Sequence, residues 1–272
     1  MLAIGDYRLH SLKVQEFLFD GTPPDSMPSG SSPLRPRVRL ATRILLIVGR
    51  GRRILVDAGV GASCLTGRWA ANAATPYLLM EQLAGLGLHP GDITDLVLTH
   101  LHSDHVGGAF ICTGDRMVPA FPCARIIVQE EQFRTASSPA AKERQSFSEA
   151  IIDELRNLPQ FMTVSGEREL FPGIDVLVSN GHTRGQQLVR VSDGRTTLLH
   201  GGDLIPTTAH YPASRVTGND IDARTAIEEK ADILEAACRE GWILFFGHDP
   251  FRHAATVLTR PAGFVPGPAP AF

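Results

Sequence analysis

Four potential metal ligands lie close together in the segment THLHSDHVGG, which begins at residue 99. His100 and His102 follow an apolar run, Ile93–Leu98, that predicts a short buried strand. Because side chains two residues apart in an extended chain point the same way, these two imidazoles can bind one ion. The chain must then turn, which leaves Asp104 and His105 free to bind a second ion. Imidazole and carboxylate ligands without a thiolate suit Zn²⁺, Mn²⁺, Fe²⁺ or Co²⁺.

Three further candidate ligands each stand beside a glycine, and each follows the end of a different predicted strand. They are His182 (NGHT), Asp203 (GGD) and His248 (FGHD). Glycine lets the backbone approach a crowded centre. A lone histidine after a strand is usually a surface residue, but together these three supply the ligands that the first segment lacks.

The predicted strands fall into clusters, with helices between them. The strands are Val38–Leu40, Ile44–Val48, Ile54–Asp57, Ile93–Leu98, Arg125–Val128, Ile174–Val178, Gln187–Val191, Thr196–Leu199 and Trp242–Phe246. Helices are predicted to begin at Thr75, at Ser138 and at Asp222, and the last of them to end at Gly241. This order favours two packed sheets with helices outside over a single parallel sheet.

The motifs THLHSDHVGG, GHT, GGD and GHD, in this order, resemble the metallo-β-lactamase superfamily over about residues 38–250. The resemblance implies an α/β (α+β) fold of the αββα type. In this sandwich two packed mixed β-sheets are flanked by helices, and a dinuclear metal centre lies in the cleft between the sheets.

The resemblance also implies a role for each candidate ligand. One metal would be held by His100, His102 and His182, and the other by Asp104, His105 and His248, with Asp203 bridging both. In the sequence ILVDAG, Asp57 would orient a ligand histidine. The expected cofactors are two divalent transition metal ions, with Zn²⁺ favoured and Mn²⁺, Fe²⁺ or Co²⁺ as alternatives.

The sequence around Asp203 indicates a branch of the superfamily. Antibiotic-hydrolysing members generally lack a bridging aspartate, so a true β-lactamase is disfavoured. The sequences GDLIPTTAH and GHDP and the long helix from Asp222 are similar to the branch that contains acyl-homoserine lactonases and organophosphate hydrolases. Two departures stand out. Leu204-Ile205-Pro206 lies where the lactonases often place a substrate-contacting tyrosine, and GHTRGQ stands where many members have GHTPGH.

The implied reaction is hydrolysis without a side-chain nucleophile. Two divalent ions lower the pKa of a bridging water toward ~7, and the hydroxide would attack a carbonyl or phosphoryl centre. Asp203 would hold both ions and Asp104 would carry a proton to the leaving oxygen, so both are predicted to be catalytic. The favoured substrate is a carboxylic ester or lactone, including an acyl-homoserine lactone as in quorum quenching. The alternatives are organophosphate or thioester hydrolysis, or a metal-bound regulatory protein without catalysis.

The substrate entrance is predicted to lie between two long aperiodic segments, Gly21–Pro36 and Pro206–Asp220. In the second segment, His210 and Tyr211 are candidate substrate contacts. Seven arginines between Arg35 and Arg53 leave open whether an anion binds there.

Composition sets the wider limits. The chain has 272 residues, of which 43% are hydrophobic and 20% charged, with a net charge of −3. These values predict one globular domain over residues 1–260. The net charge lacks the positive excess that is typical of proteins that bind nucleic acid. No apolar run approaches the ~20 residues that span a membrane, which favours a cytoplasmic protein. Its expected partners are a small-molecule substrate and, in a homodimer, a second copy.

Two local features complete these expectations. The Pro- and Gly-rich tail, residues 261–272, is expected to be loosely held. The four cysteines lack CxxC spacing, which predicts free and mostly buried thiols.

Overall fold

Strand β3 (Arg37–Gly49) shows how this sequence builds a layered core. Leu45 and Ile47 pack between the two sheets of the molecule, whereas Ile44 and Leu46 pack beneath helices on the outer face. Because successive side chains of a strand point to opposite faces and both faces are buried here, the strand is a continuous apolar run.

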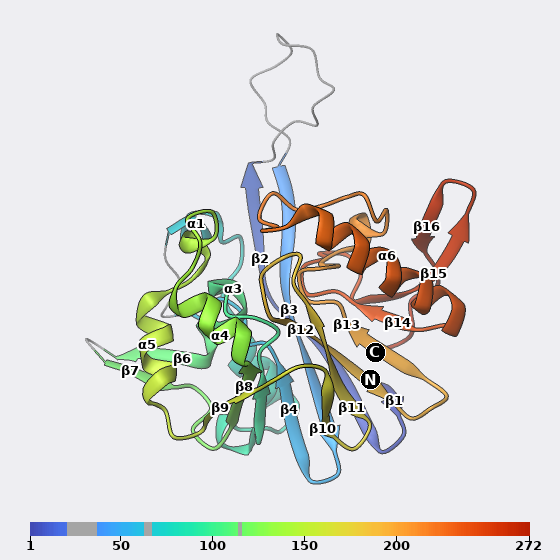
Figure 1. Ribbon diagram of the computed structural model, residues 1–272. Coiled ribbons are helices and arrows are strands. Elements are labelled where there is room, and N and C mark those ends of the chain that lie inside the picture. The colour runs from blue at the N-terminus through green and yellow to red at the C-terminus, as the bar shows by residue number, and fades with distance from the viewer. Residues whose placement is uncertain (21–36, 63–66, 114–115) are drawn as a thin grey trace.

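The computed structural model describes residues 1–20, 37–62, 67–113 and 116–272 (Figure 1). Within these residues, seven strands form the first sheet in the order β1-β2-β3-β4-β5-β8-β9. Its other strands are β1 (Leu2–Ile4), β2 (Tyr7–Asp20), β4 (Arg52–Val56), β5 (Asp95–Val97), β8 (Arg125–Gln129) and β9 (Phe161–Val164). Pairing is antiparallel from β1 to β4 and parallel from β4 to β9, so the sheet is mixed.

The second sheet, counted over the same part of the chain, has seven strands in the order β10-β11-β12-β13-β14-β15-β16. They are β10 (Arg168–Phe171), β11 (Ile174–Ser179), β12 (Gln186–Ser192), β13 (Thr197–His200), β14 (Ile243–Phe245), β15 (Ala254–Arg260) and β16 (Gly263–Pro266). Only β13 and β14 are paired in parallel among these described strands. A separate hairpin joins β6 (Phe110–Thr113) to β7 (Arg116–Pro119).

Helices cover the outer faces of both sheets (Figure 1). The α-helices of the described chain are α1 (Gly67–Asn72), α2 (Leu79–Gly85), α3 (Ser103–Val106), α4 (Glu130–Ser137), α5 (Glu149–Asn157) and α6 (Ala223–Glu240). Apolar residues of α2, α4 and α5 pack on the first sheet, and those of α6 pack on the second. The predicted αββα sandwich of two mixed sheets flanked by helices is therefore confirmed. No helix in the described ranges is long and apolar enough to cross a membrane.

The parallel strand pairs determine where the candidate ligands meet. Because β4 and β5 are parallel neighbours, Asp57 and His100 leave the first sheet at the same edge. Because β13 and β14 are parallel neighbours, Asp203 and His248 leave the second sheet together. The carboxyl ends of these strands thus bring polar residues that are distant in sequence to one rim of the sandwich.

Each predicted strand overlaps an observed strand, but two predicted helix starts are wrong. Thr75 does not cap a helix; its hydroxyl accepts the Glu16 N–H, and α2 begins four residues later. Ser138 follows the end of α4 rather than opening a helix, and α5 begins after Ser148. In the described structure neither α4 nor α5 has a side-chain hydrogen bond at its N-cap, so the usual sequence signal of a helix start is missing there.

The ends of α6 follow the prediction closely. The Asp222 side chain accepts the Thr225 N–H at 3.1 Å and caps the helix. Gly241 ends it at φ 69°, a left-handed conformation that glycine adopts without strain.

Two other expectations require correction, and eight of the described strands were not predicted, namely β1, β2, β6, β7, β9, β10, β15 and β16. The tail is not loosely held, because β16 pairs with β15 and the ring of Phe272 lies 5.8 Å from that of Phe245. None of Cys112, Cys123 and Cys238 is buried, contrary to the prediction, while Cys64 lies outside the described residues. Strand β2 was missed, although Leu12, Val14 and Phe17 are buried along it.

Candidate metal centre

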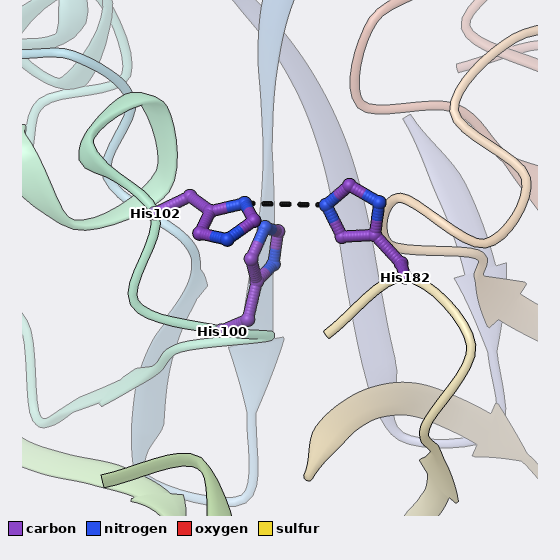
Figure 2. A group of neighbouring side chains, drawn as sticks. All are labelled: His100, His102 and His182. Atoms are coloured by element: carbon purple, nitrogen blue, oxygen red, sulfur yellow. Dashed lines mark hydrogen bonds between the residues drawn. The ribbon is translucent and has the colours of Figure 1, made fainter. Parts of the chain in front are cut away.

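His100, His102 and His182 form the first group of potential ligands (Figure 2). Each offers a nitrogen, and these atoms all lie within 4.8 Å of one another. His182 Nε2 lies 3.2 Å from His102 Nδ1. In the described part of the chain, the Nε2 atom of His100 is buried without a hydrogen-bond partner. A buried polar atom without a partner is rare in proteins, and here it identifies a place where a ligand is expected.

The second group joins Asp104, His105, Asp203 and His248. His248 Nε2 lies 3.1 Å from His105 Nε2 and 3.4 Å from Asp104 Oδ2. Asp104 and His105 belong to the short helix α3, which provides the turn expected after His102. The structure thus brings the candidate ligands together in two groups.

Asp203 lies between the two groups. Its Oδ2 is 3.4 Å from His182 Nε2, and its Oδ1 is 3.3 Å from His105 Nε2 and 3.1 Å from His248 Nε2. Gly202 at φ 50° turns the chain here, and its N–H donates to His200 Nδ1. The Asp203 N–H donates to Gln186 Oε1 at 2.9 Å. Gln186 is one of the residues at which GHTRGQ differs from the family's GHTPGH, and it therefore helps to position the Asp203 carboxylate.

Hydrogen bonds behind the ligands decide which nitrogen of each ring faces the centre. His248 Nδ1 lies 2.9 Å from the carbonyl oxygen of Ala41, which can only accept, so Nδ1 carries the proton. His105 Nδ1 lies 2.8 Å from Asp57 Oδ2, and His182 Nδ1 lies 2.8 Å from Asp220 Oδ1. In the neutral rings, the Nε2 lone pairs of all three therefore converge on the centre.

This arrangement fits divalent metal ions. Converging lone pairs and carboxylates repel one another at 3.1–3.4 Å unless a positive charge, from a metal ion or a ring proton, compensates them. Burial, followed by the neighbouring imidazoles, lowers the pKa of His100 well below its usual value, which keeps it in the neutral form that binds metal. Burial opposes ionisation of Asp203, but His248, His105 and His182 outweigh it and hold the pKa of Asp203 well below its usual range. The nitrogen and oxygen donors suit Zn²⁺ and similar ions.

Asp57 lies where the resemblance expects it, behind His105. Its Oδ1 accepts the Thr99 N–H at 2.7 Å, and its Oδ2 accepts the Thr99 hydroxyl at 2.8 Å. Asp57 has φ 65°, which is uncommon outside glycine. These hydrogen bonds offset the backbone strain and hold the carboxylate against His105.

Asp220 has the same role behind His182 and was not predicted. Its Oδ1 also accepts the Thr217 hydroxyl at 2.6 Å, and its Oδ2 accepts the Thr217 N–H at 2.8 Å. No motif surrounds Asp220, and it follows His182 by 38 residues. A sequence signal for this pair is therefore lacking, because only the fold brings them together.

Gly181 lets the backbone next to His182 lie close to helix α6. A Cβ atom at this position would lie 2.3 Å from the Cα of Ala226 in α6. The backbone is held there because the Asp222 N–H donates to the Gly181 carbonyl at 3.0 Å. Any larger side chain would push α6 away from the ligand.

A cavity of roughly 240 Å³ opens onto the two groups. Five ligands line it, namely His102, Asp104, His182, Asp203 and His248. Leu40, Val60 and Trp69 form an apolar part of the wall. Pro206, Thr207, Thr217 and Asn219 also line it, so the Pro206–Asp220 segment borders the site as expected, whereas Gly21–Pro36 lies outside the described residues.

The two candidate substrate contacts have different positions. His210 lines the cavity, and its Nδ1 lies 2.9 Å from Thr207 Oγ1. Burial, together with the charge of Lys230, lowers the pKa of His210 to about 4, so the ring is neutral near pH 7. Tyr211 is instead fully buried against Phe246, and its hydroxyl lies 3.2 Å from the Ala255 carbonyl. This placement does not support the expected contact between Tyr211 and substrate.

Replacing Asp220 by alanine is expected to weaken metal binding at the three-histidine group by about 10- to 100-fold, because His182 loses the acceptor that orients it. The measurement is titration of metal-free protein with Zn²⁺, with metal content determined after dialysis. Asp222→Asn is the matched control, since Asp222 caps α6 and touches no ligand ring. Equal metal affinity in Asp220→Ala and the wild type would contradict the role of Asp220.

Comparison with known proteins agrees with this geometry. The chain matches the family model described as "Metallo-beta-lactamase superfamily" over residues 37–252. It is 30% identical over 223 residues to the N-acyl homoserine lactonase AiiB of Agrobacterium fabrum, covering 75% of this chain and 78% of that protein. It is 27% identical over 211 residues to an N-acyl homoserine lactonase of Bacillus cereus, covering 72% and 76% of the two chains.

Solved structures share the fold. A probable metal-dependent hydrolase from Staphylococcus aureus superposes with a TM-score of 0.82 at 23% identity, over 94% of each chain. AidC, described as a dizinc quorum-quenching lactonase, superposes with a TM-score of 0.82 at 19% identity, over 100% of this chain and 97% of that one. With the family match extending over most of its length, from residue 37 to 252, the chain belongs to the metallo-β-lactamase superfamily.

Proposed function

We propose that this protein is a dinuclear metal-dependent hydrolase that opens the ester bond of a lactone, with an acyl-homoserine lactone as the favoured substrate. The observation that carries the proposal is the position of Asp203, whose two oxygens face both ligand groups. One tetrahedral site uses four ligands, whereas the described residues gather seven. The names of the relatives, which are N-acyl homoserine lactonases, support the choice of substrate.

Zn²⁺ is the favoured metal at both positions. The three-histidine group would hold one ion and the group of Asp104, His105 and His248 the other, with Asp203 in contact with both. When bound, such ions supply Lewis acidity and an activated water at neutral pH. The protein contributes the neutral imidazoles, the ionised Asp203 and the hydrogen bonds that hold them.

Asp104 is the candidate group for proton transfer. It lines the cavity as well as belonging to the second ligand group, so it faces both metal and substrate. In a lactone, the leaving oxygen stays attached to the product and remains in the cavity. A carboxylate in a fixed position can therefore accept a proton from the attacking water and deliver it to that oxygen.

His210 is the candidate for binding a substrate oxygen. Thr207 Oγ1 accepts the Ala209 N–H, and its own hydroxyl proton can be donated to His210 Nδ1, which is the tautomer that we propose. The neutral ring then carries its proton on Nε2 and can donate a hydrogen bond into the cavity. In this role His210 would replace the tyrosine that the lactonases often place shortly after the bridging aspartate.

The rest of the cavity suits a neutral, partly apolar substrate. No lysine or arginine is found among its described lining residues, so it offers no side-chain cation to a phosphate monoester. Leu40, Val60 and Trp69 can instead contact an acyl chain.

The proposed function is tested with a panel of substrates and metal-quantified protein. We expect kcat/KM for an N-acyl homoserine lactone to exceed that for a phosphotriester, a thioester and a cephalosporin by about 100-fold or more, as an enzyme selects by its complementarity to one transition state. A higher kcat/KM for the phosphotriester or the thioester would favour the corresponding alternative instead. Absence of turnover for the whole panel would contradict a hydrolase.

Asp203→Ala is expected to remove one of the two metal ions and to lower kcat by at least ~100-fold, because the variant loses the carboxylate that faces both groups. Elemental analysis and steady-state kinetics measure these two effects. Asp249→Asn is the control, since Asp249 is adjacent to His248 but accepts backbone N–H groups of Thr208 and Phe251 instead of facing the centre. Equal losses of metal in the two variants would mean that Asp203 is not a bridging ligand.

His210→Phe is expected to raise KM for a lactone by about 10-fold, the usual effect of losing one hydrogen bond to a substrate, with metal content unchanged. Because the pKa of His210 is about 4, the ring stays neutral above pH 5, and the variant should keep the wild-type pH profile between pH 5.5 and 8. His210→Gln, which retains a donor, should recover part of the loss. A limb of the pH profile that disappears in His210→Phe would contradict this assignment.

A further inference from the structure

A second hollow, which we call the basic groove, lies beside the cavity. It is lined by Phe19, Val38, Arg39, Arg215, Phe251 and Arg252. Leu40, Thr207 and His210 line both the cavity and the basic groove, so the two share a wall. A ligand that binds at the metal centre and extends past His210 therefore enters the basic groove.

An apolar surface connects the two hollows. Trp69 lines the cavity and Phe19 lines the basic groove, and their rings meet edge to face at 5.2 Å. Leu40 of β3 continues this surface between them. An acyl chain can follow this surface without crossing a polar barrier.

Phe251 lies at the outer end of the basic groove with 82% of its surface exposed. Its position is fixed by the backbone, because Asp249 Oδ1 accepts the N–H groups of Phe251 and Arg252 at 2.9 and 2.8 Å. A large aromatic ring that the fold holds in water is typical of a binding surface.

The charges of the basic groove favour an anion. Arg39 shares Glu16 with Lys13, so these three side chains together keep a positive charge. Arg215 and Arg252 make no ion pair within the described chain, although the whole protein has a net charge of −3. The carboxylate in the lining, Asp249, is occupied by N–H groups and by the Thr208 hydroxyl. The backbone at Arg215 is also anchored, because buried Lys230 donates to its carbonyl.

We propose that the basic groove binds the far end of the acyl chain and selects lactones whose chain ends in a carboxylate. The inference rests on the proposed function, since it needs the ester group at the metal centre. The apolar surface from Trp69 to Phe19 would bind the methylene groups. Arg215 and Arg252 would bind the terminal carboxylate, because a guanidinium group matches it with two hydrogen bonds.

The experiment compares two N-acyl homoserine lactones of equal chain length, one ending in methyl and the other in carboxylate, across short, medium and long chains. Above a threshold length, the wild type should prefer the carboxylate-ended substrate, through a lower KM. The double variant Arg215→Gln/Arg252→Gln should lower kcat/KM for that substrate by about 5- to 10-fold, as expected for two solvent-screened ion pairs. Its effect on the methyl-ended substrate should be much smaller, and added salt should reduce the preference of the wild type.

Arg224→Gln is the matched control, because Arg224 is an exposed arginine of α6 that pairs with Glu228 away from both hollows. It should leave both substrates unaffected. Turnover of the methyl-ended lactone without any preference for the carboxylate would overturn this inference but leave the proposed function intact. Absence of turnover for both substrates would overturn the two proposals together. A change of oligomeric state in the double variant, measured by light scattering, would mean that the basic groove is an interface between copies.

Discussion

Repulsion among the buried ligands is the constraint on which the rest of this structure depends. Five imidazoles and two carboxylates converge at one rim of the sandwich, and three of the imidazole rings direct an Nε2 lone pair inward. Such a cluster is unfavourable without a compensating positive charge. The protein therefore has to hold the ligands against their mutual repulsion, and the surrounding structure serves that purpose.

Outer hydrogen bonds supply much of this support, and they come from irregular segments as well as from a strand. Asp57 adopts a left-handed backbone conformation directly after β4, and Asp220 is held in a turn by Thr217. The Ala41 carbonyl on β3 orients His248 across more than two hundred residues of chain. Each of these acceptors fixes the proton on Nδ1, so that metal affinity depends on residues that never touch a metal.

The Pro206–Asp220 segment links the candidate metal centre to the two hollows. Its last residue, Asp220, orients His182, while Thr207 and His210 form the wall shared by the cavity and the basic groove. Asp249 accepts a hydrogen bond from the hydroxyl of Thr208, the residue next to Thr207. Asp249 also accepts the Phe251 N–H and so fixes the turn that exposes Phe251. One loop and one turn thus shape the path from the ligand cluster to the basic groove.

The sequence alone determined the candidate ligands, the layered fold and the strands that lead to those residues. These features follow from local patterns, namely the HxHxDH spacing, glycine beside His182, Asp203 and His248, and apolar runs of strand length. The sequence signals for both ends of α6 were also local, because Asp222 and Gly241 act on the residues next to them. Tertiary structure alone decided the pairing of Asp220 with His182 and the burial of Tyr211. Contacts of this kind depend on how distant segments pack, and no spacing along the chain encodes that distance.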